Sequence, residues 1–257
     1  MRHMKFLGAA LCLLLAGQAS ALAGTVTVMI SGGFSPAYNA LIAAYEKSSG
    51  NTLVTVRGPS MGADPTAIPA RLARGEAADV VIMARAGLDK LVADGSVTEP
   101  TDLGVGRIAM AVKAGAARPD IGTVEAFKQA LLDAKSIAYP DAASGFYLRD
   151  VLFKKLGIEK EMAAKSHMIQ ATPVGLNIAR GEYELGFQNY AELKPIAGID
   201  IVGLIPEAVQ LSIPYTATLV AKAPNPAGGR DLIRFLASPA AYDAIRASGL
   251  KPAGEKN

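Results

Sequence analysis

The sequence predicts an α/β protein with two lobes, each built around a sheet with helices, and a ligand cleft between the lobes. Two observations lead to this fold class. Strand-like and helix-like patterns alternate along almost the whole 257-residue chain. Residues 25–105 and 107–205 each contain a complete series of these elements. Two such units, joined by extended segments, create a crevice of the kind in which ligands bind.

The strands are predicted where β-branched and other apolar residues form short runs between turn residues. Turn residues and caps set the limits of the helices: Pro36 stands at a first helical position, Gly75 and Gly181 follow last turns, and Thr123 is a capping residue. In chain order the predicted strands are 25–30, 53–57, 79–84, 107–113, 136–139, 165–170, 184–188, 199–204 and 213–221. The predicted helices are 35–48, 64–74, 87–93, 123–134, a helix from the 141–145 turn to about 156, 173–180, 226–237 and 239–248.

The first 23 residues have the layout of a secretory signal peptide. Arg2 and Lys5 form a basic segment, the apolar run Phe6–Ala16 follows, and small residues at Ala21 and Ala23 precede a cleavage site. The apolar run of about 11 residues is short of the roughly 20 that a membrane-spanning helix needs. We therefore expect an exported, periplasmic protein without stable membrane insertion. The pattern assigns 24–107 and 218–257 to lobe 1 and 108–217 to lobe 2.

The composition excludes several classes of protein. Cys12 lies in the predicted signal peptide, so the mature chain has no thiol chemistry and no disulfide, and His167 is its one histidine. A histidine-rich metal site is therefore excluded, and we expect no metal and no cofactor. Nothing in the charge pattern indicates a nucleic-acid partner, because the net charge is +3 and no run of Lys or Arg occurs. We expect a monomer.

Three turns that follow predicted strands share one chemistry. They are Ser31-Gly32-Gly33-Phe34-Ser35, Ser60-Met61-Gly62 and Ser144-Gly145. The first turn of a helix exposes unpaired N–H groups and the positive end of the helix dipole, which attract anions. Glycine lets a ligand approach the backbone, and serine adds a neutral donor. Together the turns predict a binding site for a small anion.

Longer stretches of the chain resemble the molybdate-binding proteins of ABC importers, a branch of the type II periplasmic binding proteins. The resemblance rests on SGGFS at 31–35, ARLARGEAADVVIMA at 70–84, GEYELGFQNYAEL at 181–193 and the C-terminal segment 234–252. It implies the type II periplasmic binding protein fold and an oxyanion held by hydroxyl and backbone donors. The implied binding positions are Gly33 in the first turn, Ser60, Ser144, Val174 and Asn189.

The chain is more similar still to a sub-branch of this family that resembles aconitate isomerase. The shared motifs are SGGF at 31–34, GPSMG at 58–62, IPARLARGE at 68–76 and ASGFY at 143–147. This resemblance implies an enzyme that moves a proton and a double bond in a tricarboxylate. Two functions therefore stay open. The first is a periplasmic solute-binding protein for a small oxyanion or carboxylate, acting as the receptor of an ABC importer with a membrane permease. The alternative is a periplasmic aconitate isomerase.

An isomerase needs a group that removes and returns a proton. Tyr147, Asp141, Asp64 or a water assisted by Lys or Arg are the candidates, and Tyr147 is preferred because it lies in the first turn of a predicted helix. A substrate with several carboxylates also favours guanidinium partners, which bind carboxylates in a bidentate manner. Arg71 and Arg85 are the candidates for that role.

Overall fold

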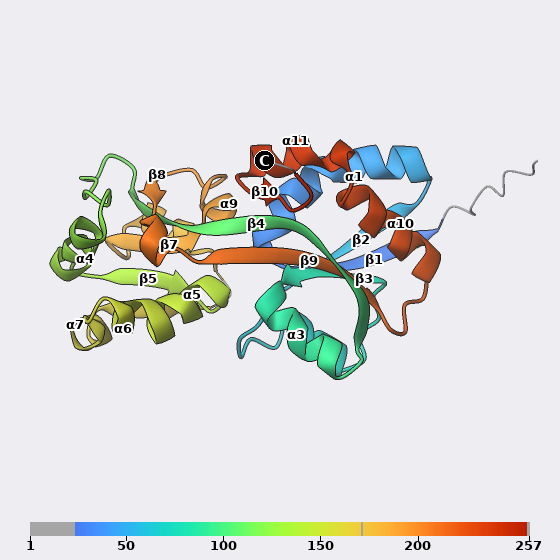
Figure 1. Cartoon of the computed structure of the whole chain (residues 1–257), viewed down its shortest axis with the longest axis horizontal. Helices are drawn as coiled ribbons and strands as arrows, with labels where there is room; N and C mark the ends of the chain where they lie inside the picture. The colour runs from blue at the N-terminus through green and yellow to red at the C-terminus, as the bar shows by residue number, and fades with distance from the viewer. Residues whose placement is uncertain (1–23, 171, 256–257) are drawn as a thin grey trace, which may run out of the picture.

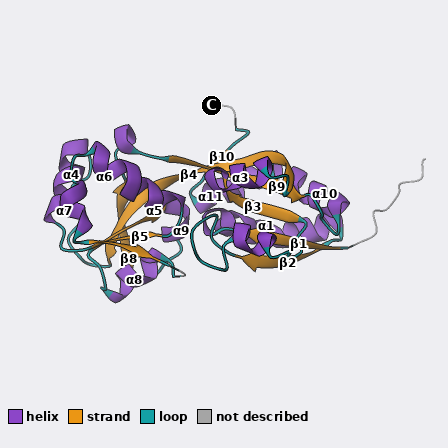
Figure 2. Cartoon of the chain, turned by 90° about the horizontal axis from the view of Figure 1, so that it is seen from below, coloured by secondary structure: helices purple, strands orange, loops and turns teal. Residues whose placement is uncertain are grey.

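The protein has two groups of strands and helices joined by two long strands. The computed structural model describes residues 24–170 and 172–255. Strands β4 (Val97–Lys113) and β9 (Ser212–Val220) run between the two groups (Figure 1). The two groups also stand apart in the perpendicular view of Figure 2. The predicted signal peptide lies outside the described residues. In the described part of the chain, no helix is both long and apolar enough to cross a membrane.

Ten strands form the sheets in the described part of the chain. The remaining eight are β1 (Thr25–Ile30), β2 (Thr52–Arg57), β3 (Val80–Ala84), β5 (Ile137–Pro140), β6 (Ser166–Ile169), β7 (Leu185–Asn189), β8 (Ile199–Leu204) and β10 (Lys251–Pro252). Sheet A has the order β2-β1-β3-β9-β4-β10, and sheet B has the order β8-β4-β7-β5-β6.

The α-helices of the described residues are α1 (Ser35–Ser49), α2 (Ile68–Ala73), α3 (Arg85–Ala93), α4 (Val124–Asp133), α5 (Ala143–Tyr147), α6 (Phe153–Lys155), α7 (Glu159–Ala163), α8 (Val174–Arg180), α9 (Tyr190–Leu193), α10 (Pro226–Leu236) and α11 (Tyr242–Ser248). Short 3-10 turns occupy η1 (Gly32–Phe34), η3 (Glu207–Val209) and η4 (Pro239–Ala241). A π-helical turn, η2 (Leu148–Leu152), makes α5 and α6 one continuous helical segment.

Strand β4 belongs to both sheets. Up to Arg107 it pairs antiparallel with β9 in sheet A, and from Ile108 it pairs with β7 and β8 in sheet B. The predicted lobe bounds, 24–107 with 218–257 and 108–217, stay a prediction. Strand β9 pairs with β4 in sheet A from Ser212 onward. The chain therefore returns to sheet A before residue 218, where the sequence predicts the second segment of lobe 1 to begin.

The parallel strands direct their carboxyl ends toward the space between the two groups. In sheet A, β1 is parallel to β2 and β3, and in sheet B, β5 is parallel to β6 and β7. Central strands of parallel sheets are buried on both faces and are therefore continuously apolar. Strand β3, with the sequence VVIMA, is buried throughout. Ligand sites of open α/β sheets lie beyond such carboxyl ends.

Most predicted elements are confirmed, but two are wrong in extent. The strand predicted at 107–113 begins at Val97. Its first half was not predicted, because Pro100 and the glycines at 104 and 106 interrupt the strand pattern. Register shifts and the positive φ of Glu99 accompany these irregularities. The helix predicted from 64 begins only at Ile68, because the Asp64 carboxylate accepts hydrogen bonds from the amide and hydroxyl of Thr66 and forms a turn there.

Asp79 connects three segments of sheet A that are far apart in sequence. Its side chain is 2% exposed, and its carboxylate accepts hydrogen bonds from the amide of Thr27, at 2.7 Å, and from the amide of Asn225. We predict that Asp79→Ala lowers the free energy of unfolding by about 2–4 kcal/mol, because two backbone donors lose a charged partner. Urea unfolding measures the loss. Asp89→Ala, which removes an exposed ion pair with Arg85, is the control and is expected to cost less than about 1 kcal/mol. Equal losses for the two variants would contradict the prediction.

Candidate functional site

A cavity of about 660 Å³ lies between the two sheets. The ends of strands from both sheets line it: Ile30, Arg57 and Ala84 from sheet A, and Pro140, Ile169 and Gln188 from sheet B. Pockets for small organic ligands have about 300–1,000 Å³. This cleft is therefore large enough for such a ligand.

The three predicted turns meet in this cleft. Ser31, which precedes η1, lines it together with Gly32 and Gly33 of η1. Ser60 lines it from the loop after β2, and Ser144 lines it from α5. All three serines are buried, at 3%, 5% and 3% exposure. The neighbours Met61 and Gly145 do not line the cavity. The structure thus brings together one residue or more from each turn.

The Ser31 hydroxyl is buried and has no hydrogen-bond partner among the described residues. A buried polar atom without a partner costs free energy, and Ser31 is one of the residues that line the cleft. The Ser60 hydroxyl accepts a hydrogen bond from the amide of Ala84, at 2.9 Å, and keeps its own proton for donation. No side chain caps the first turns of η1 and α5, which leaves their amides available.

Two positions implied by the resemblance have roles behind the cleft wall. Val174 is fully buried, and its amide donates to the Gln188 side chain, which lines the cavity. Asn189 is 1% exposed, caps α9 by accepting from the amide of Ala191, and donates to the hydroxyl of Tyr215 at 2.7 Å. Neither residue lines the cavity.

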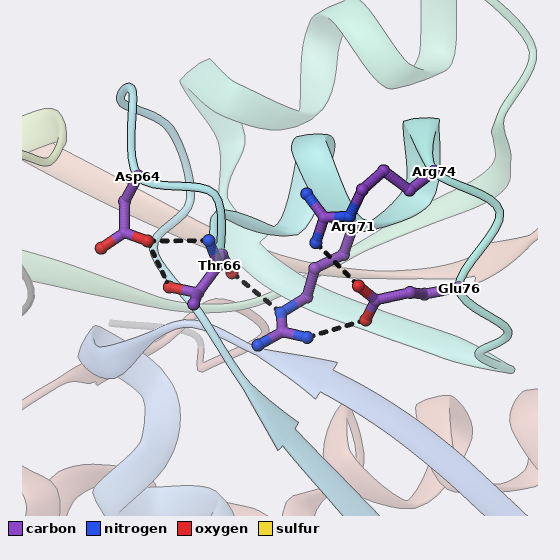
Figure 3. Close-up of polar contacts among 5 residues, drawn as sticks. All are labelled: Asp64, Thr66, Arg71, Arg74 and Glu76. Carbon is purple, nitrogen blue, oxygen red and sulfur yellow. Dashed lines mark hydrogen bonds and ion pairs between the residues drawn. The ribbon is translucent and has the colours of Figure 1, made fainter.

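The two predicted guanidinium partners do not line the cavity either. Arg71 donates to the carbonyl oxygen of Thr66 and forms an ion pair with Glu76 at 2.7 Å (Figure 3). Arg85 is exposed and pairs with Asp89 and Asp102. Both guanidinium groups are therefore paired with carboxylates outside the cavity.

The preferred candidate for the proton-transferring group also lies elsewhere. The Tyr147 hydroxyl donates to the carbonyl oxygen of Val209 at 2.8 Å, and burial raises its pKa. The other two candidates, Asp141 and Asp64, line the cavity. The hydrogen bonds from Thr66 hold the pKa of Asp64 below its usual value (Figure 3).

Arg57 is a cation of the cleft that sequence reasoning missed. It is the last residue of β2, and it donates to the hydroxyl of Ser35 and to the amide oxygen of Asn39, both at 2.9 Å. Ser35 in turn donates to the carbonyl oxygen of Ser31. Because both acceptors of Arg57 are neutral, these contacts orient the guanidinium without compensating its charge. Its place at the end of a strand that leads into the Ser60 loop is the signal that would have found it.

Glu192 and Tyr215 are the second omission, and they approach the backbone of the first turn. A Cβ atom on Gly32 would overlap the carboxylate of Glu192, and one on Gly33 would overlap the hydroxyl of Tyr215. Family resemblance implies a ligand serine at position 33. In this chain the Tyr215 hydroxyl occupies the space that a side chain at 33 would fill.

Burial governs the ionisation of both groups. Withdrawal from water raises the pKa of Glu192 to about 7, and a hydrogen bond with Gln188 opposes that rise. Burial, together with the nearby charge of Glu192, raises the pKa of Tyr215, and the hydrogen bond from Asn189 lowers it. Near neutral pH, Tyr215 is therefore a neutral donor, and Glu192 exchanges between its two forms. Among the described residues, no group of three or more His, Cys, Asp or Glu side chains could hold a metal ion.

The raised pKa of Glu192 predicts a pH-dependent contribution to stability. Between the ordinary value of 4.5 and about 7, the folded state binds the proton more tightly than the unfolded state, so this group's contribution falls as pH rises. We predict that the free energy of unfolding of Glu192→Gln, relative to that of the wild type, increases by about 1–3 kcal/mol when the pH is raised from 4.5 to 8. Urea unfolding at both pH values measures the gain. Glu161→Gln, at an exposed position of α7, should show none, and a pH-independent difference for Glu192→Gln would refute the assignment.

Comparisons with known proteins agree with this geometry. The profile of the bacterial extracellular solute-binding proteins matches residues 26–251. An aconitate isomerase from Pseudomonas sp is 50% identical over 230 residues, which are 89% of this chain and 88% of that protein. The periplasmic molybdate-binding protein of Azotobacter vinelandii superposes with a TM-score of 0.70 at 20% identity, over 88% of this chain and 98% of that one.

A second solved structure has the same fold. The sulfate-binding protein SubI of Mycobacterium tuberculosis H37Rv superposes with a TM-score of 0.67 at 14% identity, over 90% of this chain and 88% of that one. These findings confirm the predicted fold class and the resemblance to molybdate-binding proteins and to aconitate isomerase. The chain belongs to the bacterial extracellular solute-binding protein family and has the type II periplasmic binding protein fold.

Proposed function

We propose that the cleft binds a small carboxylate with several negative groups and that the chain is an aconitate isomerase, interconverting trans- and cis-aconitate. The observation that carries the choice of a carboxylate is Arg57, a guanidinium at the cleft whose protein partners are neutral. The choice of reaction is supported by the 50% identity with an aconitate isomerase over 89% of the chain.

Arg57 has the donors that a carboxylate requires. A guanidinium carries five N–H donors in a planar fork, and Ser35 and Asn39 each take one. The remaining donors can bind a carboxylate in a bidentate manner, which is stronger and more directional than a contact with a neutral group. The link from Ser35 to the carbonyl of Ser31 ties the position of this guanidinium to the first turn.

The other donors are spread around the cleft rather than gathered at one point. Ser31 and the start of η1 lie on the side of sheet A, Ser60 belongs to the loop after β2, and Ser144 lies on the side of sheet B. A tricarboxylate presents negative oxygens in three directions, whereas a tetrahedral oxyanion presents them around a single atom. The distribution of donors and the volume of about 660 Å³ therefore favour a polycarboxylate.

Three carboxyl groups also line the cleft, and their state bears on anion binding. Asp64 is engaged by the amide and hydroxyl of Thr66. Asp141 accepts a hydrogen bond from the Gln170 side chain at 3.4 Å. Burial raises the pKa of Glu192 to about 7, so part of its negative charge is removed near neutral pH. The partial neutralisation of Glu192 makes an anionic ligand compatible with this lining.

The proposed setting is the periplasm. Residues 1–23 would direct export and be removed, and membership of an extracellular family supports this assignment. We propose that the mature chain acts as a monomer, because the cleft draws its donors from one chain.

The second candidate function is that of a receptor for an ABC importer, with a membrane permease as partner. The observation that favours it is the two-lobed cleft itself, whose donors come from two sheets and can close around a solute. A receptor binds and releases its ligand unchanged, whereas an isomerase converts it. The two functions therefore differ in one measurable outcome.

We predict that the purified protein converts trans-aconitate to cis-aconitate catalytically. Proton NMR follows both isomers over time, with heat-denatured protein as the control. Turnover of many equivalents supports the isomerase. Stoichiometric binding of trans-aconitate without conversion would reject the isomerase and leave the receptor, and neither binding nor conversion would reject the carboxylate assignment.

We predict that Arg57→Gln weakens the binding of trans-aconitate about 10- to 100-fold, because a hydrogen bond to a charged group contributes about 1.5–3 kcal/mol. Calorimetric titration measures the dissociation constant. Arg234→Gln removes an exposed guanidinium that pairs with Asp231 and is expected to leave the affinity unchanged. Wild-type affinity in Arg57→Gln would remove this side chain from the site.

A further inference from the structure

Glu192 is a carboxyl group of the cleft for which anion binding provides no role. It lies on α9, directly after β7, in a helix that Asn189 caps. Its side chain reaches across to η1, where the missing side chain of Gly32 leaves room for the carboxylate. An anion receptor gains nothing from a negative group at this place. The position requires an explanation other than ligand affinity.

Among the described residues, no ion pair includes Glu192, and the hydrogen bond that favours its charged form comes from Gln188. Structural carboxylates in such surroundings are usually paired, because an unpaired charge away from water is costly. An acid or base catalyst, in contrast, needs a carboxyl group that is free of a compensating cation and can reach the substrate, and Glu192 lines the cleft.

Tyr215 provides the complementary donor next to Glu192. Its hydroxyl lies against Gly33, one residue from the glycine that Glu192 contacts. Because Asn189 donates to this hydroxyl at 2.7 Å, one lone pair of the oxygen is occupied and the hydroxyl proton is free to point into the cleft. The Ser31 hydroxyl, which has no partner among the described residues, lies in the same turn.

We propose that Glu192 is the catalytic residue that takes and returns the proton of the allylic shift, and that Tyr215 donates a hydrogen bond to the negative charge that develops on the substrate. This inference rests on the proposed isomerase function. Asp64 is less suited, because the amide and hydroxyl of Thr66 engage its carboxylate. Asp141, like Glu192, lies against a glycine and accepts from a glutamine, but Glu192 is the cleft carboxyl group whose charge acts on Tyr215. Tyr147 is excluded, because its hydroxyl is bound to Val209.

The reaction balances without an external reagent. The Glu192 carboxylate removes a proton from the methylene carbon of trans-aconitate, and the electron pair of that C–H bond forms the new double bond. The electron pair of the old double bond moves onto the conjugated carboxylate, where the donors Tyr215 and Ser31 stabilise it. The charge then returns to the former vinylic carbon, which takes the proton from the Glu192 carboxylic acid. The enzyme ends in its starting protonation state.

The ionisation of Glu192 suits this task near neutral pH. A general base is most effective when its pKa lies close to the working pH, and burial raises the pKa of Glu192 to about 7. Tyr215, Arg57, Asp64 and Asp141 are the other charged or titratable groups of the cleft. Since the free enzyme must have Glu192 ionised, kcat/KM is expected to rise with pH through about 7 and then to level off.

The decisive comparison is Glu192→Gln against the wild type. We predict that kcat for trans-aconitate falls at least about a hundredfold, while the dissociation constant stays the same or decreases because a repulsive charge is removed. Glu192→Asp should retain residual activity that still rises with pH, and Tyr215→Phe should lower kcat more than it raises KM. Glu161→Gln on α7 is the matched control and should equal the wild type.

A second readout follows the proton itself. In D2O the wild type should introduce deuterium into aconitate, as NMR detects, and Glu192→Gln should not. A Glu192→Gln variant that binds trans-aconitate and still converts it at the wild-type rate would overturn the assignment of Glu192 while the isomerase function stands. A wild type that neither converts nor deuterates aconitate would overturn both. If Glu192→Gln fails to fold, Glu192→Asp and its pH profile decide: a residual activity that is independent of pH overturns the assignment.

Discussion

The cleft depends on the close approach of two side chains, Glu192 from α9 and Tyr215 from β9, to the backbone of Gly32 and Gly33. Any side chain at these two positions would overlap Glu192 or Tyr215. The two glycines therefore allow α9 and β9 to pack closely against η1. The same lack of side chains leaves the amides of η1 accessible to a ligand. A single short turn thus provides space and backbone donors, and it contacts both α9 and β9.

The same turn explains how this chain departs from the oxyanion receptors that it resembles. The resemblance implies a ligand hydroxyl at position 33, yet glycine stands there and the Tyr215 hydroxyl takes the space. A serine hydroxyl at position 33 would supply a neutral hydrogen-bonding group and nothing more. A tyrosine hydroxyl that is fixed by Asn189 and placed beside a carboxyl group adds a polarised donor next to a titratable group. The exchange changes the chemistry of the site while the fold stays the same.

Sequence patterns predicted most of the fold, because the parallel strands are apolar and their turns carry glycine, proline or capping residues. The pattern failed at β4, where Pro100, the two glycines and a positive φ interrupt a strand that only tertiary pairing with β9 sustains. For the site, Ser31, Ser60 and Ser144 were found because their turns follow strands directly. Arg57, Glu192 and Tyr215 were missed because they come from three separate elements, and their convergence depends on how the sheets are placed. Arg71 and Arg85 were favoured for their charge, but nearby carboxylates hold both of them.

The hydrogen bond from Asn189 to Tyr215 joins β7 of sheet B to β9 of sheet A. Asn189 also caps α9, which carries the Glu192 carboxyl to Gly32. A motion that moved α9 away from η1 would expose this carboxyl to more water. Rehydration would return that carboxyl toward its ordinary acidity. The proximity of α9 to η1 therefore sets the basicity of the proposed catalytic carboxylate, and the hydrogen-bonded corner that joins the two sheets holds α9 in that place.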